Sequence, residues 1–481
     1  MRKPLRNFGH DAVLASHDYE ERAGWAALVQ NGKPVYTLEQ IIQQLTRAGT
    51  AWIGGASNPA PNAGVGTITY GFFDTAAQVY SPEASQFQPL SAAQRDAVRT
   101  AFSIWGDFVS VTFVEGPVAA ADINLGNIVT EEDHYSAYAR YPGWSREAGD
   151  IWIRAGAPSS QEIGLAQAGF RTLLHEIAHA LGMSHPGNYN AAPDVELTYE
   201  ANAEYFQDSL QYTIMSYFAS SSTGAVRTSF AATPLAHDIA AIQSLYGVNM
   251  TTRTGDTVYG FNSNAGRNAF DFALNTAPVI AIWDADGRDT LDFSGWSTAS
   301  RIDLAGGASS DGGGQTHNVQ IAFGTIIENA IGGGGDDVVI GNAGGNLLRG
   351  GSGNDRLTGD AGEDWLEGGA GADIFVYTAL GQSNVYAPRS DGKKVLPDVL
   401  ADFLSGTDKI DLSAIDAISE TAGDDAFTFI GAGAFTGQAG QLRYEVVTGY
   451  VHIYGDTDGI GGADFHIIAS GTQILAADFI F

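Results

Sequence analysis

The spacing of apolar residues divides the chain into two parts of different character. Up to about residue 250, apolar positions recur every three to four residues in four stretches and alternate with polar positions in four others. We therefore predict helices over 38–47, 92–108, 168–181 and 235–246, and strands over 65–72, 109–114, 121–125 and 150–153. After Gly247, a typical helix stop, short β-prone triplets separated by Gly, Asp and Asn replace the helical pattern. We place a domain boundary near Thr251.

A nine-residue repeat, GGxGxDxUx with U a large apolar residue, runs from Gly332 to Val376. Glycine permits the positive φ angles of a tight loop, the loop carbonyls and the Asp converge on a cation, and the closing triplet forms a short strand. Two consecutive units then make one turn of a right-handed parallel β-roll, with calcium between unit n and unit n+2. The U residues predicted to stack inside are Val339, Leu348, Leu357, Leu366 and Phe375. A flexible Gly-rich linker is the alternative, but a linker has no reason to keep Asp and an apolar residue in phase.

The repeat supplies a set of candidate calcium ligands from its loop glycines and its acidic position. One unit carries Asn346 instead of Asp, which keeps an oxygen but loses a charge. We expect the site that Asn346 shares with Asp364 to be weaker than the sites that pair Asp337 with Asp355 and Asp355 with Asp373. The predicted ligands are Gly333, Gly335, Asp337, Gly344, Asn346, Gly351, Gly353, Asp355, Gly362, Asp364, Gly369, Gly371 and Asp373.

Charge and composition agree with a cation-binding protein. The chain has 24 Lys and Arg against 55 Asp and Glu, a formal net charge of −31, which argues against nucleic acid as a partner. It has no cysteine, so a transition metal must be held by imidazole or carboxylate groups. The N-terminus lacks the apolar core of a cleaved export signal, and no run approaches the roughly 18 apolar residues of a membrane span.

The segment LLHEIAHALGMSHP contains the pattern HExxHxxGxxH. His175 and His179 are four apart in a predicted helix, so they share a face and can bind one ion, while Glu176 lies beside a metal-bound water. Gly182 tolerates left-handed φ, which lets the chain turn back and bring His185 to the same ion. Three neutral imidazoles and an open position predict one catalytic zinc. Satisfied core histidines are the alternative, which the added Gly and third His disfavour.

The chemistry expected of this zinc is hydrolysis. Zinc polarises a carbonyl and lowers the pKa of bound water toward about 7. Glu176 is the candidate general base, which takes the proton of the water and passes it to the leaving amine. Among the other histidines, His237 is expected to cap or pack at a helix start. His452 and His466 show no ligand spacing and are assigned no chemistry.

HExxHxxGxxH is typical of metzincins, and with Pro186, the segment MSYF and the calcium repeats the chain resembles the serralysin family of bacterial metalloproteases. The resemblance implies an α+β catalytic metzincin domain, followed by an all-β parallel β-roll and a β-sandwich-like C-terminal domain. It implies that Met215 forms a turn beneath the zinc. It also makes Tyr217 a zinc ligand that swings aside to stabilise the oxyanion. Substrate would bind extended along an edge strand, for which Ala137, Tyr138 and Ala139 are the candidates, and specificity would be broad.

The resemblance also implies further calcium sites. A site at the domain junction would use the carbonyls of Arg253, Gly255 and Thr257 with Asp284, Gly287 and Asp289, and Asp286 stands where the family usually has Gly. Another would use the carbonyl of Ile326 and Glu328, and Asp402 and Asp408 are candidates after the roll. Calcium is thus expected at several structural sites, where it would fold the acidic roll outside the cell.

The domains and partners follow from the same resemblance. We expect a propeptide at residues 1–20, a zinc metalloprotease domain at 21–250 and a calcium-binding domain at 251–481. The terminus ILAADFIF resembles an uncleaved signal for one-step export by a type I secretion apparatus, so the protein is expected to be extracellular. Protein or peptide substrates, a proteinaceous protease inhibitor and a monomeric state are also expected.

Two other functions remain open from the sequence. A calcium-dependent adhesion or binding protein of the repeats-in-toxin type could carry a non-catalytic zinc scaffold. Intact Glu176 and the open metal position argue against it, because a structural zinc normally has four protein ligands. A zinc hydrolase acting on something other than peptides is disfavoured by the extended motif.

Overall fold

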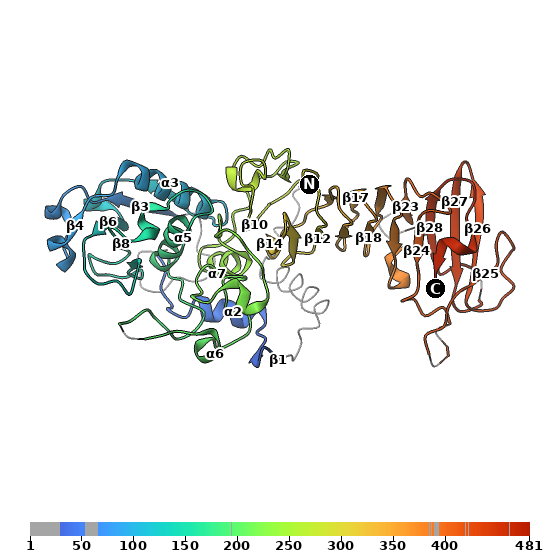
Figure 1. Ribbon diagram of the computed structural model, residues 1–481, viewed down its shortest axis with the longest axis horizontal. Helices are drawn as coiled ribbons and strands as arrows, with labels where there is room; N and C mark the ends of the chain where they lie inside the picture. The colour runs from blue at the N-terminus through green and yellow to red at the C-terminus, as the bar shows by residue number, and fades with distance from the viewer. Residues whose placement is uncertain are drawn as a thin grey trace.

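The molecule is elongated, with its helices at one end and stacked β-strands along the rest (Figure 1). This computed structural model describes residues 29–52, 66–193, 195–383, 385, 387–388, 394–418, 420, 421, 423–460 and 462–481. The propeptide predicted at residues 1–20 lies outside the described residues.

The helical end is built around a mixed sheet in the order β5-β3-β6-β8-β7, with β4 also paired to β6. The first four strands pair in parallel, whereas β7 is antiparallel to β8 and has one free edge. The four strands predicted from alternation are confirmed, although three begin two to three residues later than expected. The bounds are β3 (Thr67–Phe72), β4 (Phe87–Gln88), β5 (Thr112–Glu115), β6 (Ile123–Ile128), β7 (Ala137–Ala139) and β8 (Ile151–Arg154).

Four main helices lie at this end, where the apolar spacing predicts them; two contact the sheet and the other two pack against each other. Two of them begin with reciprocal capping boxes, Thr37 with Gln40 and Ser91 with Gln94. Within the described residues, no helix combines the length and apolar character that a membrane crossing requires. The bounds are α2 (Leu38–Leu45), α3 (Ala92–Gly106), α5 (Ala168–Ala180) and α7 (Ala236–Tyr246), with short helices α4 (Pro158–Gln161) and α6 (Tyr199–Asn202).

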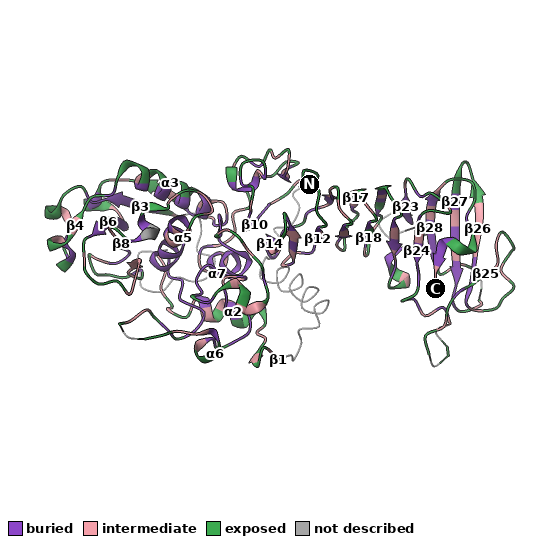
Figure 2. Ribbon diagram, viewed as in Figure 1, coloured by how far each residue is buried: buried purple, intermediate pink, exposed green. Residues whose placement is uncertain are grey.

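The repeat region forms two facing parallel sheets, as predicted. Strands 18 residues apart pair in register, for example Val339 with Leu357 and Leu348 with Leu366. The five U residues are fully buried between the sheets, and Figure 2 shows this interior in purple. One sheet has the order β10-β14-β13-β12-β16-β18-β20-β24-β29 and the other β25-β26-β27-β28-β23-β19-β17-β15-β11-β9.

Most strands of the roll are only three residues long, and near the C-terminus the longer antiparallel strands β26, β27 and β28 extend one of its sheets. The roll itself is β9 (Val258–Gly260), β10 (Ile280–Ile282), β11 (Thr290–Asp292), β12 (Arg301–Asp303), β13 (Ser309–Gly312), β14 (Gln315–Ile321), β15 (Asn329–Ile331), β16 (Val338–Ile340), β17 (Leu347–Ser352), β18 (Arg356–Thr358), β19 (Trp365–Ala370) and β20 (Ile374–Val376). The end is β23 (Asp398–Leu400), β24 (Lys409–Asp411), β25 (Thr428–Phe429), β26 (Gln441–Val447), β27 (Tyr450–Asp456), β28 (Phe465–Ser470) and β29 (Phe479–Ile480). Two further hairpins are β1 (Val29–Gln30) with β2 (Lys33–Pro34) and β21 (Ala387–Pro388) with β22 (Lys394–Val395).

The helical and β-rich parts share buried contacts. Asp107 after α3 forms ion pairs with Arg253 and Arg267. The side chain of Gln320 on β14 accepts a hydrogen bond from the Ala236 N–H (2.9 Å) and donates one to the Gln211 carbonyl (2.7 Å). Residues of β10 also belong to the core of the helical part. The change in secondary structure near Thr251 is therefore not a break in packing.

Candidate active site

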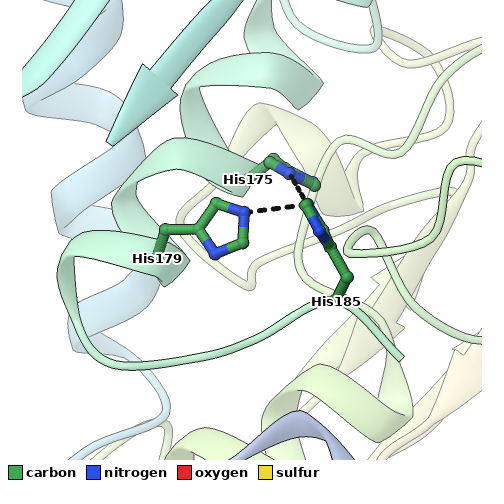
Figure 3. A group of neighbouring side chains, drawn as sticks. All are labelled: His175, His179 and His185. Atoms are coloured by element: carbon green, nitrogen blue, oxygen red, sulfur yellow. Dashed lines mark hydrogen bonds between the residues drawn. The ribbon is translucent and has the colours of Figure 1, made fainter. Parts of the chain in front are cut away.

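Three histidines from one helix and the turn after it converge on a single point (Figure 3). His175 and His179 lie one turn apart on α5, and Gly182 ends the turn with φ of 104°. A Cβ at Gly182 would lie 2.0 Å from the Thr50 carbonyl oxygen, so only glycine fits there. The chain then returns His185, whose Nε2 lies 3.0 Å from Nε2 of His179 and 3.3 Å from Nε2 of His175.

The outer nitrogen of each imidazole is held by a backbone carbonyl. Nδ1 of His175 lies 2.8 Å from the Ile214 carbonyl oxygen, Nδ1 of His179 2.7 Å from that of Met183, and Nδ1 of His185 2.9 Å from that of Tyr189. Because a carbonyl only accepts, each Nδ1 carries the proton and each Nε2 is left with a lone pair.

The converging lone pairs fit a transition metal. Burial and neighbouring histidines lower the pKa of His175 and of His179, the latter to about 3, and mainly burial lowers that of His185 to about 4. The rings are therefore neutral at ordinary pH, and three facing lone pairs repel one another unless a cation lies between them. Neutral imidazole with a carbonyl-bound outer nitrogen is the usual zinc ligand.

Glu176 lies beside this centre. Its side chain is buried, and Oε2 forms no hydrogen bond within the described part of the chain. Burial raises the pKa of Glu176 to about 8, against the opposing charge of Arg171. A buried carboxyl oxygen without a partner, next to a cation site, is suited to receive a proton from water.

Met215 and Tyr217 lie on the segment that follows Ile214, whose carbonyl holds His175. Met215 is fully buried in the core of the helical part. The ring of Tyr217 packs 4.5 Å from that of His185, measured between centroids. Burial and then the charge of Glu176 raise the pKa of Tyr217 to about 12, so its hydroxyl keeps its proton.

Asp238, which was not predicted from the sequence, holds residues 213–215 in place. Asp238 Oδ2 accepts hydrogen bonds from the N–H groups of Ile214 (2.8 Å) and Leu235 (2.9 Å), and Oδ1 accepts the Thr213 hydroxyl proton. Since the Ile214 carbonyl binds His175, this carboxyl supports a metal ligand through one intervening residue. An acid in the first turn of a helix was the available signal.

His237 packs, as one of the two roles expected for it. Its buried ring lies between Tyr212 and Phe323, with centroids 5.2 and 6.1 Å away. The carboxyl that accepts the Leu235 N–H at this helix start belongs to the next residue, Asp238.

A cleft of about 670 Å³ opens over the histidines. Strand β7, with the predicted residues Ala137, Tyr138 and Ala139, forms one side, and Asn190, Ala191 and Tyr217 also line the cleft. The free edge of β7 thus borders the same space as the three Nε2 atoms.

The roll aligns the predicted acidic positions in two ladders. The N–H of Asp337 donates to Asp355 Oδ1 (2.8 Å), and that of Asp355 donates to Asp373 Oδ1 (2.9 Å). In the other ladder the N–H of Asn346 donates to Asp364 Oδ1 (2.8 Å). The glycines of the repeat lie around these groups; a Cβ at Gly353, for instance, would lie 2.3 Å from the Gly335 carbonyl oxygen. Each unit therefore pairs with the second unit after it, as predicted.

Both ladders continue past the repeat. Asp408 Oδ1 accepts the Asp373 N–H (3.0 Å), and Asp402 accepts the N–H groups of Gly368 and Gly369. The other ladder continues to Asp398, whose Oδ1 accepts the Asp364 N–H (3.1 Å). The sequence analysis missed Asp398 because it follows Asp364 by 34 residues instead of 18.

The residues predicted at the domain junction are also close together. Asp289 Oδ1 accepts the Thr257 N–H (2.8 Å), and Glu328 Oε2 accepts the Asp289 N–H (2.7 Å). Burial, with the nearby charges of Asp284 and Glu328, raises the pKa of Asp289 to about 8. A Cβ at Gly287 would lie 2.7 Å from the Gly255 carbonyl oxygen, whereas Asp286 is exposed. Arg253 is engaged with Asp107, and the Ile326 side chain is exposed.

Two histidines without ligand spacing in the sequence prove to be neighbours. Nδ1 of His452 on β27 lies 3.0 Å from Nε2 of His466 on β28, and the Tyr454 ring stacks on His466. The antiparallel pairing of β27 with β28 brings them together, which no local pattern reveals.

Three convergent histidines and an unpaired carboxyl oxygen beside an open cleft fit a metal-dependent hydrolase. The chain matches the family model "Peptidase M10 serralysin C terminal" over residues 248–481. It is 40% identical to Serralysin A of Dickeya chrysanthemi, across 98% of this chain and 95% of that protein. It is 40% identical to Metalloprotease AprA of Pseudomonas entomophila, across 94% and 91%, and 41% identical to Serralysin of Photorhabdus luminescens, across 82% and 80%. The chain belongs to the serralysin family of metalloproteases.

Proposed function

We propose that this metalloendopeptidase acts outside the cell, uses one zinc ion held by His175, His179 and His185, and cleaves protein substrates with broad specificity. The observation that carries the proposal is the set of three Nε2 lone pairs fixed toward one point by three carbonyls. Zinc bound there would supply Lewis acidity, which lowers the pKa of water toward about 7 and polarises a scissile carbonyl.

Glu176 is proposed as the general base. Its unpartnered Oε2 would take a proton from the attacking water as the oxygen adds to the scissile carbonyl carbon. The same carboxyl would then deliver the proton to the leaving amine as the C–N bond breaks. Burial around Glu176 keeps other water away from this proton.

Tyr217 is proposed as the partner of the oxyanion. Its raised pKa keeps the phenol protonated, so that it can donate a hydrogen bond to the negative oxygen of the tetrahedral adduct. The ring lies close enough to His185 for the hydroxyl to serve as a zinc ligand when substrate is absent, as the family resemblance implies.

Substrate is proposed to bind as an additional strand on the free edge of β7. Backbone hydrogen bonds to Ala137–Ala139 would hold any extended peptide and favour broad specificity. A proteinaceous inhibitor could occupy the same edge.

Calcium is proposed to fill the two Asp ladders, the junction site around Asp289, and the positions after the roll. In calcium-poor cytoplasm the acidic roll would stay unfolded and compatible with one-step export, and millimolar calcium outside would fold it. The acidic, apolar C-terminus is proposed as the export signal.

The test is casein hydrolysis in millimolar calcium by the wild type and by Glu176→Ala. We expect activity that 1,10-phenanthroline abolishes and zinc restores, and a loss of about 10²–10⁴-fold in the variant if Glu176 is the base. Thermal unfolding of both proteins with zinc and calcium controls for folding. Equal activity in the two proteins would remove Glu176 from the mechanism, and phenanthroline-resistant cleavage would remove the metal.

A further inference from the structure

The free edge of β7 determines in which direction an extended peptide would run through the cleft. An extended peptide added to that edge is more stable antiparallel than parallel to β7. Its residues before the cleaved bond then lie toward Tyr141, whose ring is 5.7 Å from that of His179, and its residues after the bond lie toward Tyr135. Beyond Tyr135, on the same side, Glu132 lines the cleft.

The charged side chains that line this cleft, among the described residues, are all acidic: Glu83, Glu132 and Glu176. Glu176 is committed to the proposed chemistry. Glu132 lies near Tyr135, on the side that receives substrate residues after the cleaved bond, whereas Glu83 is hydrogen-bonded to Tyr138 and Arg140.

Glu83 is a fixed negative charge in the cleft wall. It is 9% exposed, and Oε1 accepts hydrogen bonds from the Tyr138 hydroxyl (2.6 Å) and from Arg140 (2.8 Å), while Oε2 forms none among the described residues. Burial would raise the pKa of Glu83, but hydrogen bonds that include these two lower it to about 2. Arg140 offsets much of this charge.

Glu132 is exposed in the lining of the cleft, and its carboxylate is within hydrogen-bonding reach of the Tyr135 hydroxyl. Its N–H donates to the Thr130 hydroxyl, which fixes the backbone, and its carboxylate lies near the Tyr135 ring. The neighbouring cation, Arg154, donates to the Tyr135 carbonyl and does not line the cleft. Among the described residues, no lysine or arginine lines the cleft at this end to offset the charge of Glu132.

We infer that Glu132 is a specificity determinant that favours a lysine or arginine side chain two or three residues after the cleaved bond. The inference rests on the proposed endopeptidase function and refines its broad specificity. At about 3.4 Å per residue, a long cationic side chain at either position spans from the strand edge to an exposed carboxylate. An exposed ion pair of this kind changes kcat/KM by about two- to fivefold.

The test uses quenched fluorescent peptides that differ at one residue after the cleaved bond, either Lys, Gln or Glu. We expect the wild type to cleave the Lys peptide with a two- to fivefold higher kcat/KM than the Gln peptide, and the Glu peptide more slowly. Glu132→Gln should abolish the difference and Glu132→Lys should reverse it. Glu131→Gln, an exposed neighbour outside the cleft lining, is the matched control and should keep it.

Salt and the position of the lysine add two more readouts. The preference should shrink in 0.5 M salt, because screening shortens the reach of exposed charges to less than about 8 Å. A preference that survives Glu132→Gln, or that appears only when Lys precedes the cleaved bond, would overturn the assignment. Equal cleavage of the three peptides by the wild type would overturn it as well, while leaving the endopeptidase function intact. Cleavage of none of them would instead overturn the proposed function.

Discussion

The histidine centre and the Asp ladders differ in how they hold buried polar groups. At the histidine centre every Nδ1 is bonded to a carbonyl, and the rings are neutral. In the ladders Asp355, Asp364 and Asp398 are at most 2% exposed, and the Oδ2 of each has no hydrogen bond among the described residues. The imidazole Nδ1 atoms of the first site therefore have hydrogen-bond partners before an ion binds, whereas the buried carboxylate Oδ2 atoms of the second do not.

This difference in the burial of polar groups indicates a different role for each of the two proposed metals. Three neutral rings fixed by carbonyls cost less to bury than unpaired carboxylates, so the helical part can form its centre without zinc and would need the ion for chemistry. Buried carboxylates without partners are costly, so the proposed calcium ions would be needed for the roll to fold. Because the two parts share a core and the Gln320 bridge, the folded roll in turn supports α7 and the Met215 segment.

The largest expected effect comes from removing each metal separately. Phenanthroline should lower activity by at least about 10²-fold, because metal Lewis acidity supplies several kcal/mol to hydrolysis, with little change in the far-ultraviolet spectrum. A calcium-selective chelator should remove much of the β-sheet signal by circular dichroism and lower the Tm. Full β structure in excess calcium chelator would contradict the division of roles.

The second effect concerns a single ladder residue. Asp355 accepts a hydrogen bond from Asp337 and donates one to Asp373, so Asp355→Ala should remove a ligand from two proposed calcium sites. In millimolar calcium we expect the Tm to fall by about 5–10 °C, measured by calorimetry. Asp424→Ala, at an exposed Asp, is the control and should be neutral. The specific activity per zinc of the folded Asp355→Ala protein should stay unchanged, and a loss there would mean that the ladder acts on the chemistry directly.

The third effect separates the two regions by pH in metal-free protein. Burial, and then neighbouring carboxylates, raise the pKa of Asp355 to about 7 and of Asp364 to about 8, and mainly burial raises that of Asp398 to about 7. Their contribution to stability is full below pH 3.8 and is lost as the pH rises through 7–8. The histidines, with lowered pKa values, contribute fully above about pH 6.5 and lose that contribution as the pH falls toward 4.

Hydrogen exchange of calcium-free, zinc-free protein at pH 5 and pH 9 measures both regions at once. The roll should be better protected at pH 5 and the α5 region at pH 9. Calcium at pH 9 should restore protection of the roll. If protection changed in the same direction in both regions, the two regions would unfold as one cooperative unit, and the separate titrations would not be resolved.

The histidine centre can be predicted from the sequence almost completely, because the three histidines and Glu176 lie within eleven residues of one helix and turn. The groups that hold His175 in place cannot be predicted in this way. The carbonyl of Ile214 and the carboxyl of Asp238 come from segments that are distant in sequence and are placed by tertiary packing. The roll is readable in the same way, since a nine-residue phase sets both ladders. Asp398 escapes that phase because a longer segment precedes it.

The smallest effect tests whether charge in a ladder sets calcium affinity. Asn346 is 2% exposed, and its Nδ2 donates to the Glu328 carbonyl (3.1 Å), which an Asp could not do. Asn346→Asp therefore exchanges a hydrogen bond for a carboxylate beside Asp364. Without calcium the variant should be less stable than wild type, because the new charge faces a buried acid and a carbonyl. With calcium the cation satisfies both oxygens, so the midpoint of a calcium titration followed by circular dichroism should shift to a severalfold lower concentration.

Asn354→Asp, at an exposed position of a neighbouring unit, adds the same charge outside the ladder and should shift the midpoint much less. Equal shifts in the two variants would mean that overall charge, and not the ladder position, controls calcium binding.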